Sequence, residues 1–373
     1  MRIGVPREIK NHEYRVGLTP QSVAELRALG HHVWVETQAG ADIGFSDADY
    51  EKAGARIAAD GEQVFAEAEL IVKVKEPLAS ERARLHAGHT LFTYLHLAPD
   101  RPQTDELLAS GATCIAYETV TDAKGRLPLL APMSEVAGRM SIQVGASCLE
   151  KAKGGRGVLL GGVPGVAPGK VVIVGGGVVG SHAAAMAIGL GAEVTILDKN
   201  MEALRRLDAQ YGNRIATRYS TRAALSELIL AADLVVGSVL IPGAAAPKLI
   251  SAGMVRQMKA GAVLVDVAID QGGCAETSRP TSHTHPTYVV DEVVHYCVTN
   301  MPGGVARTAT LALNNATLPF VIALAEKGTR RALEEDVHLR NGLNVAGGAI
   351  SNAGVAQAHK LPYVPAEEVL LRL

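Results

Sequence analysis

The chain has 373 residues, a length that predicts two domains. It is 48% hydrophobic and 20% charged, which excludes an intrinsically disordered protein. The 36 Lys and Arg nearly balance the 38 Asp and Glu, so the charge favours neither a nucleic-acid nor a membrane partner. Four scattered cysteines and a charged N-terminus without an apolar run predict a cytoplasmic protein with reduced thiols.

The first third of the chain alternates strand and helix signals. Thr19 and Pro20 form a favourable helix start, and Gly30 ends that helix. A second short helix is predicted over residues 63–68. The predicted strands cover residues 2–5, 32–35, 70–74, 90–95 and 113–116. Strands separated by helices indicate βαβ units and a parallel sheet.

A long helix is predicted over residues 132–153, followed by a glycine-rich loop over 154–169. Residues 158–180 resemble a membrane span, because Lys170 is their single charge. They also contain eight Gly and two Pro, which would break a lipid-exposed helix repeatedly. We therefore interpret them as a loop, a buried strand and a tight turn.

A second βα series follows. Its predicted strands cover residues 171–174, 193–197, 216–218, 234–237 and 263–267, with an edge strand over 287–290. Its predicted helices cover residues 178–190, 201–211, 222–231 and 252–258. Helices over 308–326 and 330–338 come next, then an irregular tail with a short helix near Ala366.

This order predicts a two-domain α/β protein. Residues 127–306 would form a central, Rossmann-type doubly wound parallel sheet. Residues 1–126 and 307–373 would form a discontinuous α/β domain that binds the substrate.

The glycine pattern G-x-G-x-x-G of Gly175, Gly177 and Gly180 points to a dinucleotide. It follows an apolar strand and opens a helix, and Asp198 ends the next strand. A carboxylate at that place accepts hydrogen bonds from the ribose and repels a 2′-phosphate, which predicts NAD as the cofactor. A tight turn without a nucleotide is the alternative interpretation.

Three ionisable residues follow predicted strands directly: Lys75, His96 and Asp270. In open parallel sheets, ligands bind beyond the carboxyl ends of the strands. Each residue also has a structural interpretation, as an exposed edge cation, a solvated histidine or a loop cap. His283, His285, His295 and Cys297 match no zinc spacing, so we predict no metal.

The chain resembles the alanine dehydrogenase family, which includes the NAD-binding subunit of proton-translocating transhydrogenase. The resemblance extends over nearly the whole chain. It is carried by residues 4–8 (GVPRE) with Arg15, 72–77 (VKVKEP), 94–97 (YLHL), 131–139 (APMSEVAGR), 154–157 (GGRG), 266–274 (DVAIDQGGC) and 300–302 (NMP). The glycine pattern occurs in many unrelated enzymes, whereas the segments 131–139 and 266–274 are far more specific.

The resemblance implies an NAD-dependent amino-acid dehydrogenase that converts L-alanine reversibly to pyruvate and ammonium, as a cytoplasmic homohexamer. Arg15 and Lys75 would bind the substrate, and His96 and Asp270 would be catalytic. The implied NAD contacts are Ser134, Gly175, Gly177, Val178, Val179, Gly180, Asp198, Ser220, Val239, Leu240, Val267, Ala268, Ile269, Asp270, Arg279, Val298, Thr299, Asn300 and Met301. The family commonly has a basic residue where this chain has Ala203, which leaves that contact open.

Two other functions stay open at this point. A soluble NAD-binding subunit of a transhydrogenase would exchange hydride with a partner and need no small substrate. A non-enzymatic NAD sensor would not need Lys75, His96 and Asp270 at strand ends.

Overall fold

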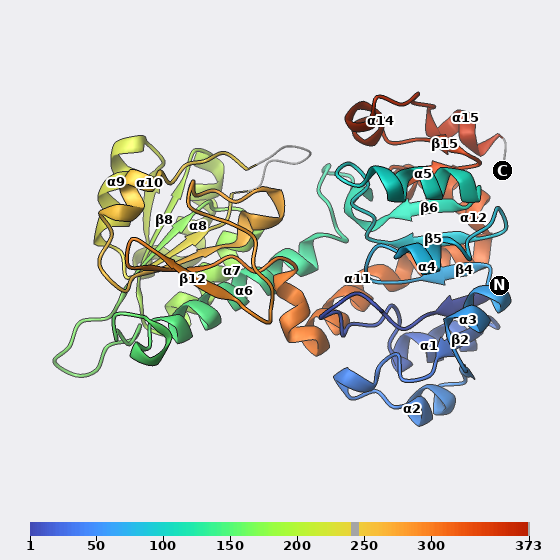
Figure 1. The fold of residues 1–373 in the computed structure, drawn as a ribbon, viewed down its shortest axis with the longest axis horizontal. Coiled ribbons are helices and arrows are strands. Elements are labelled where there is room, and N and C mark those ends of the chain that lie inside the picture. The colour runs from blue at the N-terminus through green and yellow to red at the C-terminus, as the bar shows by residue number, and fades with distance from the viewer. Residues whose placement is uncertain (240–245, 372–373) are drawn as a thin grey trace. The chain divides into compact units, whose positions relative to one another are not determined.

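The structure is a computed structural model that describes residues 1–239 and 246–371. The chain forms two compact units. The first consists of Met1–Met133 and Val305–Leu373, and the second is Ser134–Gly304. Both are α/β units built on a mostly parallel sheet, as predicted (Figure 1).

The sheet of the first unit has eight strands in the order β15-β14-β6-β5-β4-β1-β2-β3. Six strands run parallel, whereas β14 pairs antiparallel with β6, and β15 with β14. The bounds are β1 Arg2–Val5, β2 His32–Glu36, β3 Arg56–Ala58, β4 Leu70–Val72, β5 Thr90–Thr93, β6 Thr113–Ala116, β14 Leu343–Ala346 and β15 Ala349–Ile350.

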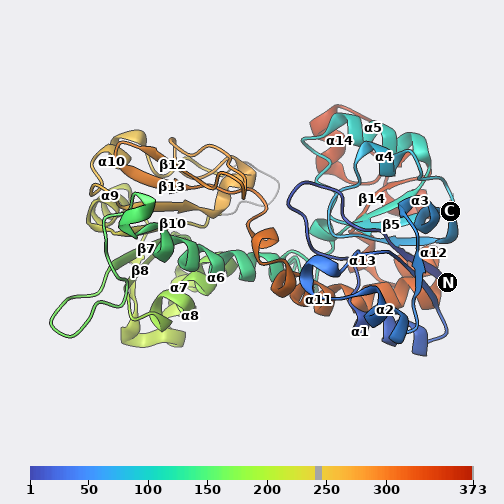
Figure 2. The same ribbon diagram turned by 60° about the horizontal axis from the view of Figure 1, so that its bottom comes forward.

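Helices cover both faces of this sheet. Figure 2 shows α3, α4, α5 and α14 on one face and α1, α11 and α12 on the other. The helices of this unit are α1 Pro20–Ala28, α2 Asp47–Lys52, α3 Gly61–Glu67, α4 Ala79–Arg82, α5 Arg101–Ser110, α11 Ala306–Lys327, α12 Thr329–Glu335, α13 Val337–Arg340, α14 Ala353–His359 and α15 Ala366–Leu370. The predicted start of α1 is confirmed, since the Thr19 side chain accepts a hydrogen bond from the Ser22 N–H and Pro20 follows it.

Helix α11 belongs to the core. In the described part of the chain, one helical stretch, Met301–Lys327, has the length and apolar composition of a membrane span, and it is partly buried. Its Asn314 is buried, and Oδ1 of Asn314 accepts hydrogen bonds from the Thr19 N–H (2.8 Å) and the Ser22 hydroxyl (2.9 Å). These contacts hold α11 against the start of α1 within the first unit.

The sheet of the second unit has seven strands in the order β12-β13-β11-β10-β7-β8-β9, all parallel except the edge strand β12. Its strands are β7 Lys170–Val174, β8 Glu193–Asp198, β9 Ala216–Tyr219, β10 Leu234–Gly237, β11 Val263–Asp266, β12 Thr287–Val290 and β13 Val293–Tyr296. Its helices are α6 Ala131–Cys148, which begins in the first unit, α7 Val178–Gly189, α8 Met201–Tyr211, α9 Arg222–Ala231 and α10 Ala252–Arg256. Figure 2 shows α6, α7 and α8 on the opposite face of the sheet from α9 and α10, which is a doubly wound arrangement.

Several elements differ from the prediction. The strands predicted over 70–74 and 90–95 end two residues earlier, so Lys75 and His96 lie in loops. The helix predicted over 330–338 is divided at Asp336, whose side chain caps α13. The tail is not irregular, because β14 and β15 complete the first sheet. The strands β3 and β13 and the helices α2, α4, α5 and α14 were not predicted.

Candidate active site

Polar side chains gather at one edge of the first sheet. The strands β1, β4, β5 and β6 lie in the parallel part of this sheet, so their carboxyl ends meet at the same edge. The loops beyond these ends contain Glu8, Lys75, His96 and Glu118. Arg15 lies in the loop after β1, and we call Arg15, Lys75 and His96 the basic cluster.

Arg15 is held by a neighbouring carboxylate. It is 2% exposed, and its Nε and Nη2 each donate a hydrogen bond of 2.6 Å to Glu13. The Nη1 atom lies 3.0 Å from the sulfur of Met133. Burial opposes the guanidinium charge, but the bonds to Glu13 outweigh it and raise the pKa of Arg15, so it stays a cation. A planar guanidinium fixed in this way suits recognition of a carboxylate.

The loop of Lys75 is held by a buried ion cluster. Glu8 Oε1 accepts hydrogen bonds from the Val74 N–H (2.7 Å) and the Lys75 N–H (3.2 Å). The ammonium of the fully buried Lys73 binds Glu8 at 3.1 Å and Glu81 at 2.6 Å. Lys73 is therefore structural, whereas the Lys75 ammonium lies 3.6 Å from Glu76 and its side chain is 13% exposed.

His96 follows β5 with a left-handed backbone, at φ 50°. Its imidazole stacks on Tyr94, with ring centroids 5.8 Å apart and planes 5° from parallel. Tyr94 also interacts electrostatically with Arg15 and Glu118, so it neighbours two members of the basic cluster, Arg15 and His96. Burial raises the pKa of Tyr94, so its hydroxyl stays neutral and donates to the Leu129 carbonyl at 2.5 Å.

Three glutamates of this edge were missed by sequence reasoning: Glu8, Glu13 and Glu118. Glu8 accepts the backbone N–H of Lys75 and Glu118 accepts that of His96, whereas Glu13 binds the side chain of Arg15. Glu8 lies within the motif of residues 4–8, so the motif gave a signal for it. Glu13 and Glu118 carry no local signal, since an isolated glutamate in a loop is usually solvated.

The carboxyl edge of the second sheet collects nearly all of the residues predicted for the nucleotide. The chain runs from β7 to β8 and β9 on one side, and from β10 to β11 and β13 on the other. The strand order therefore reverses between the neighbouring strands β7 and β10. This is the topological switch point, and such sheets bind ligands beyond the carboxyl ends of the strands there. The predicted residues after these strands are Gly175–Gly180, Asp198, Ser220, Val239, Val267–Asp270 and Val298–Met301. Leu240 lies outside the described residues.

The glycine turn has the backbone that its sequence predicts. Gly175 has φ 109°, and a Cβ on Gly180 would lie 1.8 Å from the Gly175 carbonyl oxygen, so neither position accommodates a side chain. A Cβ on Gly177 would meet nothing within 4 Å, so this face of the turn is open. Gly177 caps α7 without a side-chain hydrogen bond, which leaves the first N–H groups of α7 directed at that open face.

The residue Ser238, which sequence reasoning did not single out, fastens this turn. Its hydroxyl lies 2.9 Å from both the Val174 and the Gly175 carbonyl oxygens. Ser238 directly follows β10, so it joins the two strands that flank the switch point.

Asp198 bonds to the turn directly. Its Oδ2 accepts the Gly176 N–H at 2.6 Å and its Oδ1 accepts the Asn200 N–H at 2.7 Å. Arg206 donates to the Gly176 carbonyl at 2.7 Å, whereas Arg205 pairs with Glu202.

Asp270 lies on a loop that a buried carboxylate closes. Asp266, which ends β11 and is fully buried, accepts hydrogen bonds from the Ala268 N–H (3.1 Å), the Cys274 N–H (2.8 Å) and the Ser278 hydroxyl (2.6 Å). The two flanks of the loop are thus tied to one side chain. Asp270 Oδ1 in turn accepts a long hydrogen bond, 3.4 Å, from the backbone of Asn300.

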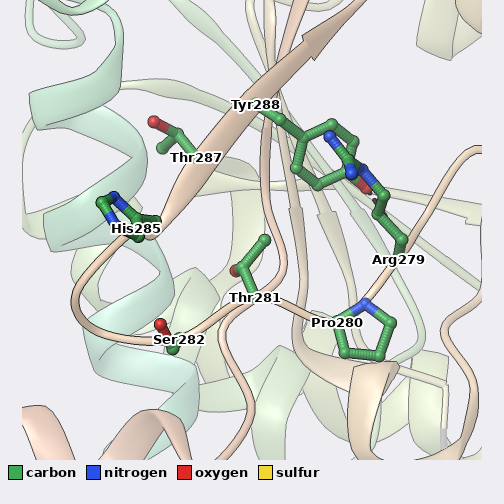
Figure 3. A pocket seen from close by; sticks show the side chains of 7 residues that line it. All are labelled: Arg279, Pro280, Thr281, Ser282, His285, Thr287 and Tyr288. Carbon is green, nitrogen blue, oxygen red and sulfur yellow. Dashed lines mark hydrogen bonds between the residues drawn. The ribbon is translucent and has the colours of Figure 1, made fainter.

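Arg279 lines a cavity of about 410 Å³ at the outer edge of the second sheet (Figure 3). Its guanidinium stacks on the ring of Tyr288, 4.2 Å from the centroid. Thr281 and Val298 form an isolated bridge, so this segment adjoins the predicted residues 298–301. The lining consists of Arg279, Pro280, Thr281, Ser282, His285, Thr287 and Tyr288.

The remaining predicted residues have simpler surroundings. Ser134 lies in α6 where the second unit begins, and the Ser220 N–H donates to the Asp198 carbonyl at 3.0 Å. Of the histidines weighed as metal ligands, His295 has other partners, since both of its ring nitrogens bond to protein oxygens. Over residues 1–239 and 246–371, no three His, Cys, Asp or Glu side chains gather as a metal site would require.

Comparisons with known proteins agree over the full length of the chain. The profile described as "Alanine dehydrogenase/PNT, N-terminal domain" matches residues 4–137, and "Alanine dehydrogenase/PNT, C-terminal domain" matches 141–353. The alanine dehydrogenase of Halomonas elongata is 62% identical over 370 residues, which are 99% of this chain and 100% of that protein.

Two solved structures have the same fold. A structure titled L-alanine dehydrogenase superposes with a TM-score of 0.94 at 54% identity, covering 96% of this chain and 99% of that one. The transhydrogenase of Sinorhizobium meliloti superposes with a TM-score of 0.80 at 26% identity, covering 95% and 99%.

Proposed function

The chain belongs to the alanine dehydrogenase/PNT family, and we propose on this basis that it catalyses the reversible, NAD-dependent oxidative deamination of L-alanine to pyruvate and ammonium. The observation that carries the proposal is the basic cluster at the carboxyl edge of the first sheet. A chain that only bound a dinucleotide would need the second sheet alone.

The second unit is the proposed NAD-binding domain. The open face at Gly177 and the uncapped start of α7 leave room and N–H donors for a pyrophosphate, so the residues fit the cofactor. Asp198 would accept the ribose hydroxyls and exclude a 2′-phosphate, which favours NAD over NADP. Bound NAD supplies the acceptor for the hydride on the alanine Cα.

The first unit is the proposed substrate domain. Arg15 and Lys75 would bind the alanine carboxylate, with the guanidinium plane fixed by Glu13. Two cations near one carboxylate also select against amines that lack it. Neither side chain needs to move a proton, so both act by binding and orienting.

His96 and Asp270 are the proposed proton-handling groups. Oxidation of the amine leaves an electron-poor carbon that takes up water, and ammonium departs once protons have been moved. An imidazole can serve as both proton acceptor and proton donor in these steps. Asp270 would orient the attacking water and balance the positive charge that develops on nitrogen.

The test is the NADH absorbance of purified protein mixed with NAD and L-alanine. Turnover of alanine, with little turnover of glycine, serine or 2-hydroxy acids, is the expected result. The second candidate, a transhydrogenase subunit, is favoured by the structural likeness to the transhydrogenase of Sinorhizobium meliloti. It predicts NADH binding without alanine turnover.

The assembly and location are proposals as well. We expect a cytoplasmic homohexamer, on the strength of the family resemblance. Light scattering on the purified protein should give about six times the chain mass of 39.0 kDa. A mass of two chains would contradict the hexamer and leave the proposed reaction unaffected.

A further inference from the structure

His96, one of the proposed proton-handling residues, has a strained left-handed backbone conformation. It is one of seven non-glycine residues with positive φ among those described, and its side chain is 45% exposed. Non-glycine residues adopt this conformation rarely and keep it only when neighbouring groups enforce it. A neighbouring group must therefore hold His96 in this conformation.

That group is Glu118, in the turn after β6. Its Oε1 accepts the His96 N–H at 2.6 Å and the Leu95 N–H at 3.2 Å, and its Oε2 lies 3.3 Å from the same Leu95 nitrogen. The carboxylate thus binds both amides of the bend. The Glu118 side chain is 16% exposed, so its bonds to Leu95 are partly buried, whereas its bond to the His96 N–H is exposed.

The same carboxylate faces the imidazole. Oε1 of Glu118 lies 3.8 Å from Nδ1 of His96. The ring of Tyr94 stacks on the imidazole from another direction. The imidazole is therefore oriented by two neighbours, of which Glu118 alone is an anion.

Another glutamate at a strand end, Glu8, also accepts two consecutive backbone N–H groups. Glu8 follows β1 and binds the amides of Val74 and Lys75 beyond the adjacent strand β4. Glu118 follows β6 and binds the amides of Leu95 and His96 beyond the adjacent strand β5. In both cases a carboxylate that follows one strand holds the loop that follows the neighbouring strand of the sheet.

We propose that Glu118 is a positioning residue for His96, which sets the direction of the imidazole through the backbone bend it holds. The proposal rests on the proposed function, in which His96 moves protons during alanine oxidation. It assigns Glu118 no contact with the substrate.

The experiment compares E118A, E118Q and the control E36A. Glu36 also accepts a backbone N–H, that of Arg7 at 2.8 Å, and its side chain is 12% exposed. We expect E118A to lower kcat for alanine by about 10²-fold, the usual cost of misplacing a reacting group, with a much smaller change in KM. E118Q should lose less, because an amide oxygen still accepts both N–H bonds, and E36A should keep its kcat.

A double mutant separates positioning from general damage. If Glu118 acts through His96, E118A should have little further effect on kcat in an H96A background. An equal loss in both backgrounds would overturn the proposal, as would wild-type turnover in E118A.

A second readout does not depend on turnover. Amide hydrogen exchange of a peptide that contains residues 95–96 should become faster in E118A and stay slow in E118Q and E36A. Unchanged exchange in E118A would overturn the proposal even in an active enzyme. Absence of alanine turnover in the wild type would instead refute the proposed function, and exchange would still decide whether Glu118 holds the bend.

Discussion

Each member of the basic cluster depends on a glutamate for its placement. Glu13 binds the guanidinium of Arg15, Glu8 binds the backbone of Lys75, and Glu118 binds that of His96. The partner differs in kind, since one glutamate fixes a side chain and two fix a loop. Positive charge is thereby concentrated for an anionic substrate while the buried part of the edge stays electrically balanced.

Asp198 should control the choice of cofactor. Asp198→Ala removes the carboxylate that would repel a 2′-phosphate and also the acceptor of the Gly176 N–H. We expect KM for NAD to rise about tenfold, as the loss of roughly 1.4 kcal/mol of binding would give, and turnover with NADP to appear. Steady-state kinetics with both cofactors check this, with Arg205→Ala as the control. A wild-type enzyme that already uses NADP would contradict the role of Asp198.

His96 and Asp270 should each be needed for turnover. His96→Ala and Asp270→Asn should each lower kcat by about 10²–10⁴-fold, the usual contribution of a positioned acid or base. Melting curves serve as the control, and near-normal turnover in either folded variant would refute that assignment.

At the scale of elements, the contact between α6 and α7 explains the glycine in the motif of residues 131–139. A Cβ on Gly138 would lie 2.3 Å from the Val179 carbonyl oxygen and 3.0 Å from the His182 Cβ. The motif glycine therefore lets α6 reach the first turn of α7. That turn contains Val178 and Val179, both predicted to contact NAD.

Gly138→Ala should consequently affect stability and cofactor binding together. Overpacking of this kind costs about 1–3 kcal/mol, and relief of the clash requires the start of α7 to shift. Thermal unfolding and NADH titration by fluorescence measure the two effects. Gly189→Ala is the matched control in α7, because a Cβ there meets nothing within 4 Å. Equal behaviour of the two variants would rule out the packing argument.

The elements that sequence reasoning found have strong local signals. The strands β7 and β11 are continuous apolar runs with marked turns, as expected for strands buried on both faces. Strand β13 was missed because it contains His295, a polar residue that is buried only since protein oxygens bind both ring nitrogens. Strand β14 was missed because its pairing with β6 is distant along the chain, so Leu343 and Ile115 give no local sign of each other.

The functional site also contains residues that could be predicted from the sequence and residues that could not. Lys75, His96 and Asp270 could be predicted because ionisable residues directly after apolar strands stand out. Glu118, Ser238 and Asp266 could not be assigned their contacts, which arise only from the order of strands in each sheet. Sequence patterns therefore reveal the ionisable residues at the strand ends. They do not reveal the side chains that hold the surrounding loops in place.

For the whole molecule, buried histidines predict a pH dependence of stability. Burial lowers the pKa of His295, His182, His89 and His31 below the ordinary value of 6.5. Below pH 6.5 the unfolded chain takes up these protons more readily than the folded one. Stability is thus fully present above pH 6.5 and is lost as pH falls, by up to about 1.4 kcal/mol per pH unit for each histidine that stays neutral.

His295 offers the cleanest test, since it is fully buried. The Val293 carbonyl can only accept a hydrogen bond, so Nδ1 carries the proton and Nε2 accepts from Thr277. Urea unfolding of His295→Gln between pH 7.5 and 5.5 should show a lower free energy of unfolding at the upper pH and a weaker decline toward the lower. The exposed His285→Gln is the control. An unchanged decline in His295→Gln would show that other groups set the slope.

The first unit is built from two separate segments of the chain, which affects its folding during synthesis. The second unit is one continuous segment, Ser134–Gly304, which a ribosome completes before it starts the segment that supplies β14. Until then, β6 has an unpaired edge, and α11 is missing from beside α1. During synthesis the later-translated middle segment can therefore mature ahead of the N-terminal one, which reverses the usual order of co-translational folding. An unpaired strand edge of this kind can pair with other nascent chains, so the chain is exposed to aggregation until residue 343 emerges and β14 can cover β6.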